Sequence, residues 1–227
     1  MNSSKKQAKI DRFFASERHR MVRRQIKARG VRDKTLLKAM KQVAREQFVP
    51  EALREFAYDD GPLPIGQAQT ISQPYIVALM IEAAALTPQS KVLEIGAGSG
   101  YCAAIMSRLA ARVFAIERDP TLAAELAPRL QQFGYSNVEL REGDGSLGWP
   151  QKAPFDAILV SAGAPRVPEV LLEQLAPGGR LVVPVADGED SQRLLRFVRS
   201  EADTFEEADL GGVRFVPLIG EEGFAPA

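Results

Sequence analysis

The sequence is poor in features that mark a secreted, disulfide-bonded or membrane protein. It contains a single cysteine, Cys102, which excludes an intrachain disulfide. Its longest apolar passage, residues 76–86, is interrupted by Glu82 and is much shorter than the roughly 20 residues of a membrane-spanning helix. The N-terminal lysines are not followed by the apolar run of a secretory signal. We therefore expect a cytoplasmic protein that does not act at a membrane.

The sequence also has no net charge, but its charged residues are unevenly distributed. Residues 1–45 contain 15 lysines and arginines against 3 acidic residues, which leaves 14 basic and 26 acidic residues for the rest of the chain. Such a basic segment is typical of a nucleic-acid arm, or of a solvated helix face that packs on an acidic body. The helical spacing of Phe14, Met21, Val22 and Ile26 favours the second interpretation, so no nucleic-acid partner is expected.

The first third of the chain is expected to be helical. With 45% apolar and 26% charged residues, the chain has the composition of a globular domain, and 227 residues suffice for one buried core. We expect a helix at 12–29 that ends before Gly30, a second helix with Asp33 as its N-cap, and a short helical piece near 50–56. A turn-rich loop follows at 58–73, and the apolar helical pattern returns at 74–86.

Beyond residue 90, short β-prone runs alternate with helical patterns. The expected strands are 91–95, 112–117, 138–141, 156–161 and 180–184, and the expected helices between them are 101–110, 121–133 and 167–175. This alternation predicts an α/β fold with a doubly wound, mostly parallel sheet. Two further candidate strands, 192–199 and 212–218, are separated by the acidic stretch EADTFEEAD and predict an antiparallel C-terminal edge.

A glycine-rich loop joins the first of these strands to the next helix. The stretch VLEIGAGSGY spans residues 92–101, so a ligand can approach the backbone at the start of the helix. A dinucleotide-binding GxGxxG loop would require a glycine where Tyr101 stands. The form Glu-x-Gly-x-Gly-x-Gly instead resembles the class I methyltransferases, which bind S-adenosylmethionine.

That resemblance implies a set of cofactor-binding residues. Glu117 ends the next strand, about 20 residues past the first glycine, where its carboxylate can accept hydrogen bonds from ribose hydroxyls. Asp144 in the sequence EGDGS follows the third strand, where this fold usually meets the adenine. The implied cofactor-binding residues are Glu94, Gly96, Gly98, Gly100, Glu117, Asp144 and Gly145.

Two classes of base methyltransferase fit the sequence poorly. Cys102 is interpreted as a small apolar residue of the helix after the glycine loop, which disfavours enzymes that activate a pyrimidine through a cysteine. Enzymes that methylate an exocyclic amine typically carry an Asn-Pro-Pro-Tyr-like sequence after the fourth strand. Residues 161–165 read SAGAP at that place.

Over nearly its whole length the chain resembles the protein-L-isoaspartate O-methyltransferases, which repair damaged proteins. The similar blocks, in order, are MVRRQIKARGVRD, VAREQFVP, LPIGQAQTISQPYIVALM, the glycine loop, NVELREGDG, APFDAILVSAGAP, GGRLVVPV and VRFVPL. The sequence departs from the family pattern at Ala44, Gln67, Ala68 and Gly163, where proline, histidine or tyrosine, glycine and alanine are more usual. We expect these departures to affect substrate range and loop stiffness, and to leave the Thr-Ile-Ser core of residues 70–72 unchanged.

The resemblance implies that the free α-carboxylate of an isoaspartyl residue takes a methyl group from S-adenosylmethionine, and that the ester then collapses to a succinimide. In this interpretation the whole chain is a single methyltransferase domain, with a helical extension at 1–57, a substrate loop at 58–73, and a cofactor-binding core with C-terminal strands at 74–227. The implied partners are isoaspartyl proteins and peptides, with no metal, and we expect a monomer. Two alternatives stay open: an RNA methyltransferase, and a binding relative without turnover.

The end of the substrate loop carries the implied catalytic residue. A carboxylate is already ionised at neutral pH, so the reaction needs no general base. The only histidine, His19, is interpreted as a surface residue. Ser72 matches the family's serine and would orient the substrate carboxylate, although a serine before Gln-Pro is also a typical helix N-cap. The implied substrate-binding residues are Leu63, Pro64, Ile65, Thr70, Ala162 and Ala164.

Overall fold

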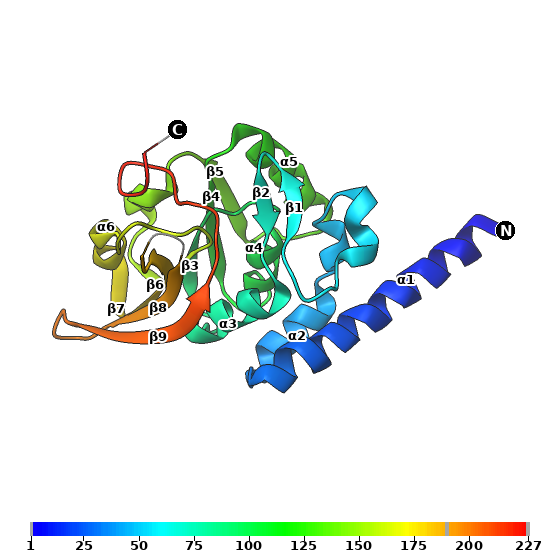
Figure 1. Ribbon diagram of the computed structural model, residues 1–227, viewed down its shortest axis with the longest axis horizontal. Coiled ribbons are helices and arrows are strands. Elements are labelled where there is room, and N and C mark those ends of the chain that lie inside the picture. Colours follow the sequence, from blue (N-terminus) through cyan, green and yellow to red (C-terminus); the bar gives the residue numbers. More distant parts are fainter. Residues whose placement is uncertain (1, 189–190, 226–227) are drawn as a thin grey trace.

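A seven-stranded sheet forms the centre of the molecule (Figure 1). The computed structural model describes residues 2–188 and 191–225. The strands are β3 Lys91–Ile95, β4 Arg112–Glu117, β5 Val138–Glu142, β6 Phe155–Val160, β7 Leu175–Ala186, β8 Gln192–Arg199 and β9 Phe205–Val213. Their order is β5-β4-β3-β6-β7-β8-β9; the first five are parallel, and the pairs β7–β8 and β8–β9 are antiparallel. The predicted mostly parallel sheet with an antiparallel edge is therefore confirmed.

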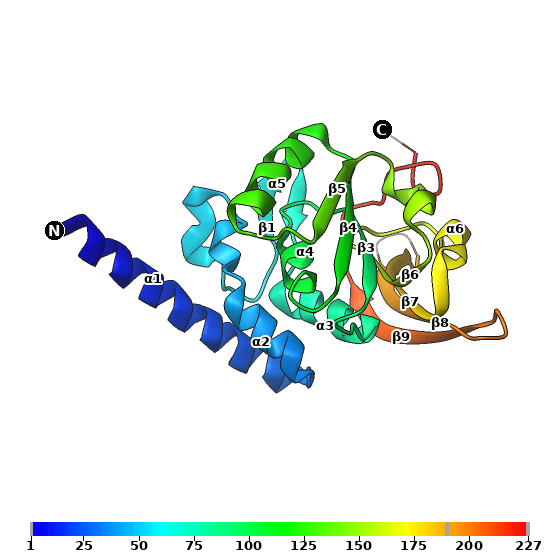
Figure 2. The same cartoon turned by 180° about the vertical axis from the view of Figure 1, so that it is seen from behind.

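Side chains of the central strands alternate between two apolar cores. Val92 and Val113 face the first core, which is closed by four helices: α2 Lys34–Gln42, α3 Pro74–Ala84, α4 Tyr101–Met106 and α5 Pro120–Gln132. Leu93 and Phe114 face the second core, which is closed by α6 Glu169–Glu173 and Trp149. Helices on both faces make the sheet doubly wound, as Figures 1 and 2 show from the two sides.

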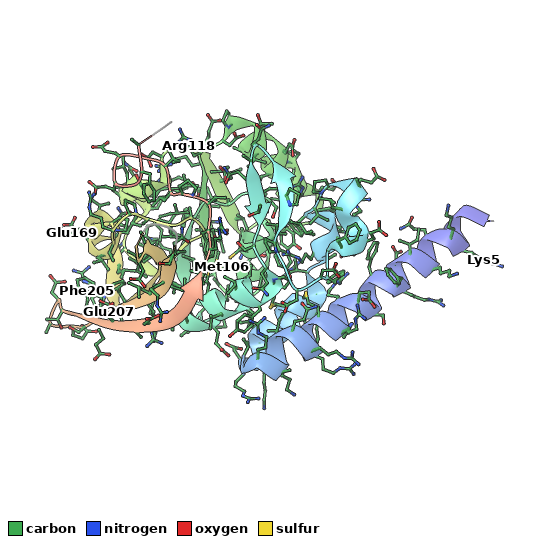
Figure 3. All side chains as sticks on the ribbon, viewed as in Figure 1. Lys5, Met106, Arg118, Glu169, Phe205 and Glu207 are labelled. Atoms are coloured by element: carbon green, nitrogen blue, oxygen red, sulfur yellow. The ribbon has the colours of Figure 1, made fainter. Side chains whose placement is uncertain are left out.

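The N-terminal helix extends further than the sequence pattern predicts. Helix α1 spans Asn2–Met21, continues as a π-helical turn Val22–Ile26 and a 3-10 turn Lys27–Arg29, and ends at Gly30 with φ of +108°. Residues 5–13 are exposed and project beyond the body (Figures 1 and 3). A hydrogen bond between the side chains of Gln7 and Asp11 supports this projecting part. From Phe14 onward the helix packs on the body, as the amphipathic interpretation requires.

Two segments differ from the sequence-based prediction. The expected loop at 58–73 contains a hairpin of β1 Leu63–Gly66 and β2 Gln69–Ile71, which the proline and glycine of β1 concealed. The last strand covers Phe205–Val213 and not 212–218, so most of the acidic stretch is itself a strand. As an edge strand, β9 keeps its carboxylates in solvent, with Phe205 and Glu207 at the far end of the molecule from α1 (Figure 3).

Two helices are also shorter than predicted. Helix α4 ends at Met106 and α6 covers only Glu169–Glu173, whereas residues 101–110 and 167–175 were expected. Leu175 already belongs to β7, where it pairs with Phe155. In the described part of the chain, no helix is both long and apolar enough to cross a membrane.

The start of α2 tests the predicted capping of helices. The side chain of Asp33 accepts hydrogen bonds from the backbone N–H groups of Thr35 (2.7 Å) and Leu36 (3.0 Å). Leu36 is fully buried, so the cap also fixes a core residue. Asp33 is therefore the N-cap of this helix, as predicted.

We expect Asp33→Ala to lower the free energy of unfolding by about 1 kcal/mol, because two backbone donors lose their acceptor. Asp33→Asn keeps a capping oxygen and should cost only a few tenths of a kcal/mol. Urea unfolding followed by circular dichroism measures both values. Equal losses for the two variants would show that the charge, and not the cap, is what matters.

Candidate active site

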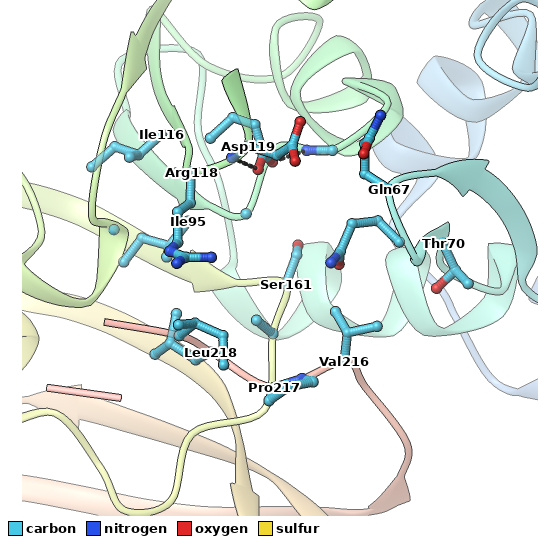
Figure 4. A pocket seen from close by; sticks show the side chains of 17 residues that line it. Gln67, Thr70, Ile95, Ile116, Arg118, Asp119, Ser161, Val216, Pro217 and Leu218 are labelled. Carbon is cyan, nitrogen blue, oxygen red and sulfur yellow. Dashed lines mark hydrogen bonds between the residues drawn. The ribbon is translucent and has the colours of Figure 1, made fainter. Parts of the chain in front are cut away.

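A cavity opens where the carboxyl ends of β3 and β6 meet. The strand order reverses direction between these two neighbours, which is where ligands bind in open α/β sheets. The backbone N–H of Ser161, just after β6, donates to the carbonyl of Ile95 at the end of β3 (2.8 Å). The lining residues are Gln67, Gln69, Thr70, Ile95, Gly96, Gly98, Ile116–Asp119, Gly145, Ser161, Ala162 and Val216–Ile219 (Figure 4).

The glycine loop is held in place by Glu117. One carboxylate oxygen of Glu117 accepts the N–H of Gly98 (2.7 Å), and the other accepts the N–H of Asp119 (2.8 Å), as the dashed lines in Figure 4 show. Each oxygen keeps capacity for a further donor, since a carboxylate has about four acceptor sites. The side chain therefore shapes the loop and still faces the cavity.

Gly100 is required by packing. Its φ is +85°, and a Cβ at this position would lie 2.2 Å from a methyl carbon of Leu126 on α5. Gly100 therefore lets α5 approach the start of α4 and does not line the cavity. Gly96, Gly98, Gly145 and Glu117 of the predicted set do line it.

A second, smaller hollow lies beneath the glycine loop. It is lined by Glu94, Cys102, Ser161, Ser72 and their neighbours. Glu94 is buried, and its Oε2 atom has no hydrogen-bond partner among the described residues. Burial raises the pKa of Glu94 to about 8; hydrogen bonding to Cys102 opposes the shift, and the charge of Glu117 adds to it.

The other acid–base candidates are unsuited to catalysis. Burial raises the pKa of the Cys102 thiol well above its ordinary value, so it stays protonated, which agrees with its interpretation as a small packed residue. His19 is exposed on α1, where its Nδ1 atom contacts the carbonyl of Ala15 (2.6 Å).

The β1–β2 hairpin covers one side of the cavity. Its turn residues Gln67 and Ala68 both have positive φ (52° and 55°), a conformation that glycine adopts more easily. The turn brings Gln67 and Thr70 to the cavity, opposite Ile95 and Arg118 (Figure 4). The departure at Ala68 therefore falls on a strained position of this cover.

Ser72 lies where the small hollow meets an outer groove, whose far side is formed by Gln192 and residues 212–216. Three hydroxyl residues, Thr70, Ser72 and Ser161, line both spaces. The capping interpretation of Ser72 is wrong, because the N-cap of α3 is Gln73. The side chain of Gln73 makes no capping hydrogen bond. No other residue in the described ranges hydrogen bonds to the Ser72 side chain, so its hydroxyl is available to a ligand.

The N-terminal extension contacts the chain at both ends of the segment that carries the β1–β2 hairpin and Ser72. The guanidinium of Arg29 lies 3.6 Å above the ring of Tyr75 and pairs with Asp60 (3.2 Å). Asp60 also accepts a hydrogen bond from the Gln73 side chain (2.7 Å), next to Ser72. The end of the basic segment thus contacts both flanks of the substrate loop.

Asp144 contacts the C-terminal segment. Its carboxylate accepts hydrogen bonds from the Ser146 hydroxyl (2.7 Å) and from the backbone N–H of Glu221 (2.8 Å). Burial alone would raise the pKa of Asp144, but these hydrogen bonds hold it below its ordinary value. Asp144 lies beside the cavity wall and not in it, since Gly145 is the lining residue.

The predicted substrate-binding residues are divided between the hairpin and the loop after β6. Leu63, Pro64, Ile65 and Thr70 belong to the hairpin, and Ala162 lines the cavity. Ala164 lies outside this group. It is fully buried, its N–H donates to Pro184 (2.8 Å), and its carbonyl accepts from Ala186 (2.9 Å). Both of its backbone groups are therefore already paired with β7.

Sequence reasoning missed several lining residues. The segment after β9 returns to the cavity because the backbone of Gly163 pairs with Val216 (2.8 Å) and Leu218 (2.7 Å). The VRFVPL block marks this segment, but its apolar pattern predicted a strand. Arg118 adjoins the predicted residue Glu117 and carries no pattern of its own.

Comparison with known proteins agrees with this geometry. Residues 16–223 match the family model described as protein-L-isoaspartate(D-aspartate) O-methyltransferase. A protein from Rhodopseudomonas palustris (strain HaA2), protein-L-isoaspartate O-methyltransferase 1, is 57% identical over 212 residues, which is 93% of this chain and 86% of that protein.

Two solved structures are similar over most of the chain. A protein-L-isoaspartate O-methyltransferase superposes with a TM-score of 0.80 and 30% identity, covering 91% of this chain and 67% of that one. A Plasmodium falciparum protein described as the same kind of enzyme, in complex with S-adenosyl-L-homocysteine, has a TM-score of 0.76 and 25% identity, and covers 89% of this chain and 98% of that one. Neither an RNA methyltransferase nor a relative without turnover is favoured by these matches.

The raised pKa of Glu94 predicts a pH dependence of stability. Between the ordinary value of 4.5 and about 8, the folded state keeps a proton that the unfolded state has lost. The free energy of unfolding therefore falls as the pH rises through this window, and Glu94 adds no slope below or above it. Glu94→Gln should make the profile flatter between pH 5 and 8, as measured by urea unfolding without added ligand. Parallel profiles for the two proteins would contradict the assignment.

Proposed function

The chain belongs to the protein-L-isoaspartate(D-aspartate) O-methyltransferase family, and we propose that Ser72, at the junction of the small hollow and the outer groove, is its catalytic residue. The protein transfers a methyl group from S-adenosylmethionine to the free α-carboxylate of L-isoaspartyl residues in damaged proteins. The methyl ester then closes to a succinimide, which starts the repair.

The chemistry requires alignment more than proton transfer. The attacking carboxylate has a pKa near 4 and is ionised at neutral pH. When bound, the sulfonium of the cofactor supplies an electrophilic methyl group. Because an anion meets a cation, the protein's contribution is to orient the carboxylate and to exclude water. The absence of a suitably placed histidine or thiolate agrees with this requirement.

Ser72 is proposed to donate a hydrogen bond that orients the substrate carboxylate. The observation that carries this role is its position, shared with Thr70 and Ser161, between the hollow beneath the glycine loop and the outer groove. Its side chain has no partner among the described residues. Thr70 would brace the hairpin, and the backbone of Leu63–Gly66 and of Ala162 would hold the peptide.

The cofactor-binding residues form the second part of the proposal. Gly96, Gly98 and Gly145 give the cofactor access to the backbone, and Glu117 would accept the ribose hydroxyls. Glu94 offers the unpaired buried Oε2 atom, which suits the ammonium group of the methionine end. Gly100 acts indirectly by fixing the loop against α5, and Asp144 would meet the adenine from the edge of the cavity.

Further parts of the proposal concern assembly and location. We propose that the protein acts as a monomer on isoaspartyl proteins, without nucleic acid. The contacts of Arg29 with Asp60 and Tyr75 support a single domain that includes the N-terminal extension. The single buried cysteine supports a cytoplasmic location.

We predict that Ser72→Ala lowers the rate of methyl transfer to an isoaspartyl peptide by about 10- to 150-fold. This is the loss of one hydrogen bond to a charged group, roughly 1.5–3 kcal/mol. The measurement uses methyl-labelled cofactor and counts base-labile ester on peptides with aspartate or isoaspartate at one position. Calorimetry with S-adenosylhomocysteine reports whether the variant still folds around its cofactor site.

Ser136→Ala is the matched control, since Ser136 is exposed and lies outside the cavity and the groove. It should retain wild-type activity. Full activity of Ser72→Ala would remove Ser72 from catalysis. Equal labelling of the aspartyl and isoaspartyl peptides would contradict the proposed recognition of the substrate.

A further inference from the structure

The described part of the outer groove beside Ser72 carries a single charged residue. The groove has a volume of about 490 Å³, enough for several side chains of a peptide. Its lining residues are Pro62, Thr70, Ser72, Gln73, Ile76, Ser161, Ser191, Gln192 and Gly212–Val216. Arg214 is the only ionisable side chain among these described residues. The groove thus has a neutral wall near the reaction centre and one cationic position.

The backbone that carries Arg214 is fixed on both sides. Strand β9 ends at Val213, directly before it. Directly after it, the side-chain amide of Gln192 accepts the N–H of Phe215 (2.8 Å) and donates to its carbonyl (3.1 Å). The carbonyl of Val216 then accepts the N–H of Gly163 (2.8 Å). Arg214 therefore projects from an anchored segment, which limits the entropy lost when its side chain binds a ligand.

Among the residues that the structure describes, none pairs with the guanidinium of Arg214. Over residues 2–188 and 191–225, no carboxylate pairs with it and no hydrogen bond engages its side chain. Arg193 on the neighbouring strand β8 differs, because its Nε atom donates to Asp209 (2.8 Å). After residue 45 the chain holds 26 acidic and only 14 basic residues. An exposed, unpaired cation in this acidic part of the chain is available to an anionic ligand.

We propose that Arg214 selects isoaspartyl peptides that carry an acidic side chain close to the damaged residue. The inference rests on the proposed function and extends it to the substrate class. The reacting carboxylate is not the partner of Arg214, because Arg214 lines only the outer groove, whereas Thr70, Ser72 and Ser161 line both spaces. Charge complementarity thus favours a glutamate or aspartate near the isoaspartyl residue in sequence.

The test uses isoaspartyl peptides that differ by one residue. Glutamate, glutamine or lysine is placed one, two or three positions from the isoaspartyl residue, on either side. For each peptide, ester formation and the dissociation constant in the presence of S-adenosylhomocysteine are measured with wild type, Arg214→Glu and Arg24→Glu. Arg24 is an exposed arginine outside the groove, so its variant has the same change in net charge.

At one or more positions, wild type should prefer glutamate over glutamine over lysine, with about two- to tenfold between the extremes, as expected for exposed charge pairs. Arg214→Glu should reverse this order, and Arg24→Glu should keep it. High salt should reduce the preference.

The inference is overturned if wild type shows no charge order at any position, or if Arg214→Glu keeps the wild-type order. The two readouts separate it from the proposed function. Ester formation without a charge order rejects the role of Arg214 alone, whereas a charge order in binding without ester formation supports Arg214 and rejects the catalytic proposal.

Discussion

The hydrogen bonds that the Glu117 carboxylate accepts from Gly98 of the glycine loop and from Asp119 set the geometry of the whole site. The bond from Gly98 ties the end of β4 to the turn that leaves β3, where the strand order reverses between β3 and β6, and the bond from Asp119 holds the carboxylate in place. With the loop fixed in this way, the start of α4 can pack against α5 through Gly100, and the hairpin and the segment after β9 close over a space of defined shape. A looser loop would leave the reacting groups unaligned, and alignment is what this chemistry requires most.

How well the sequence predicted the fold depended on the kind of signal. The strands Lys91–Ile95, Arg112–Glu117 and Gln192–Arg199 were predicted with their observed bounds, because each is a β-prone run ended by a charged, glycine or turn residue. The hairpin was read as a loop, since Pro64 and Gly66 are turn residues that here lie on a two-stranded edge. The last strand was predicted too late in the chain because the residues of β9 lack an apolar pattern. Their carboxylates are nevertheless compatible with an edge strand, where they stay in solvent.

The candidate site divides in the same way. Residues in a motif, such as Gly96, Gly98 and Glu117, could be placed at the cavity because the motif itself fixes their position after a strand. Val216 and Leu218 could not, because their position depends on backbone pairing with Gly163, more than fifty residues earlier in the chain. The alternative N-cap role of Ser72 was wrong for a local reason: the helix begins one residue later than the cap pattern suggests.

The two hydrogen bonds between the side-chain amide of Gln192 and the backbone of Phe215 make positions 163 and 192 depend on each other. A Cβ at residue 163 would lie 2.3 Å from the Nε2 atom of Gln192, so the hydrogen bonds between Gln192 and Phe215 require a glycine at position 163. Positions 163 and 192 should therefore covary among relatives, with alanine at the first accompanied by a shorter or rearranged side chain at the second. A substrate range that differs between relatives would then trace to this pair, because it determines where the arginine-bearing segment lies.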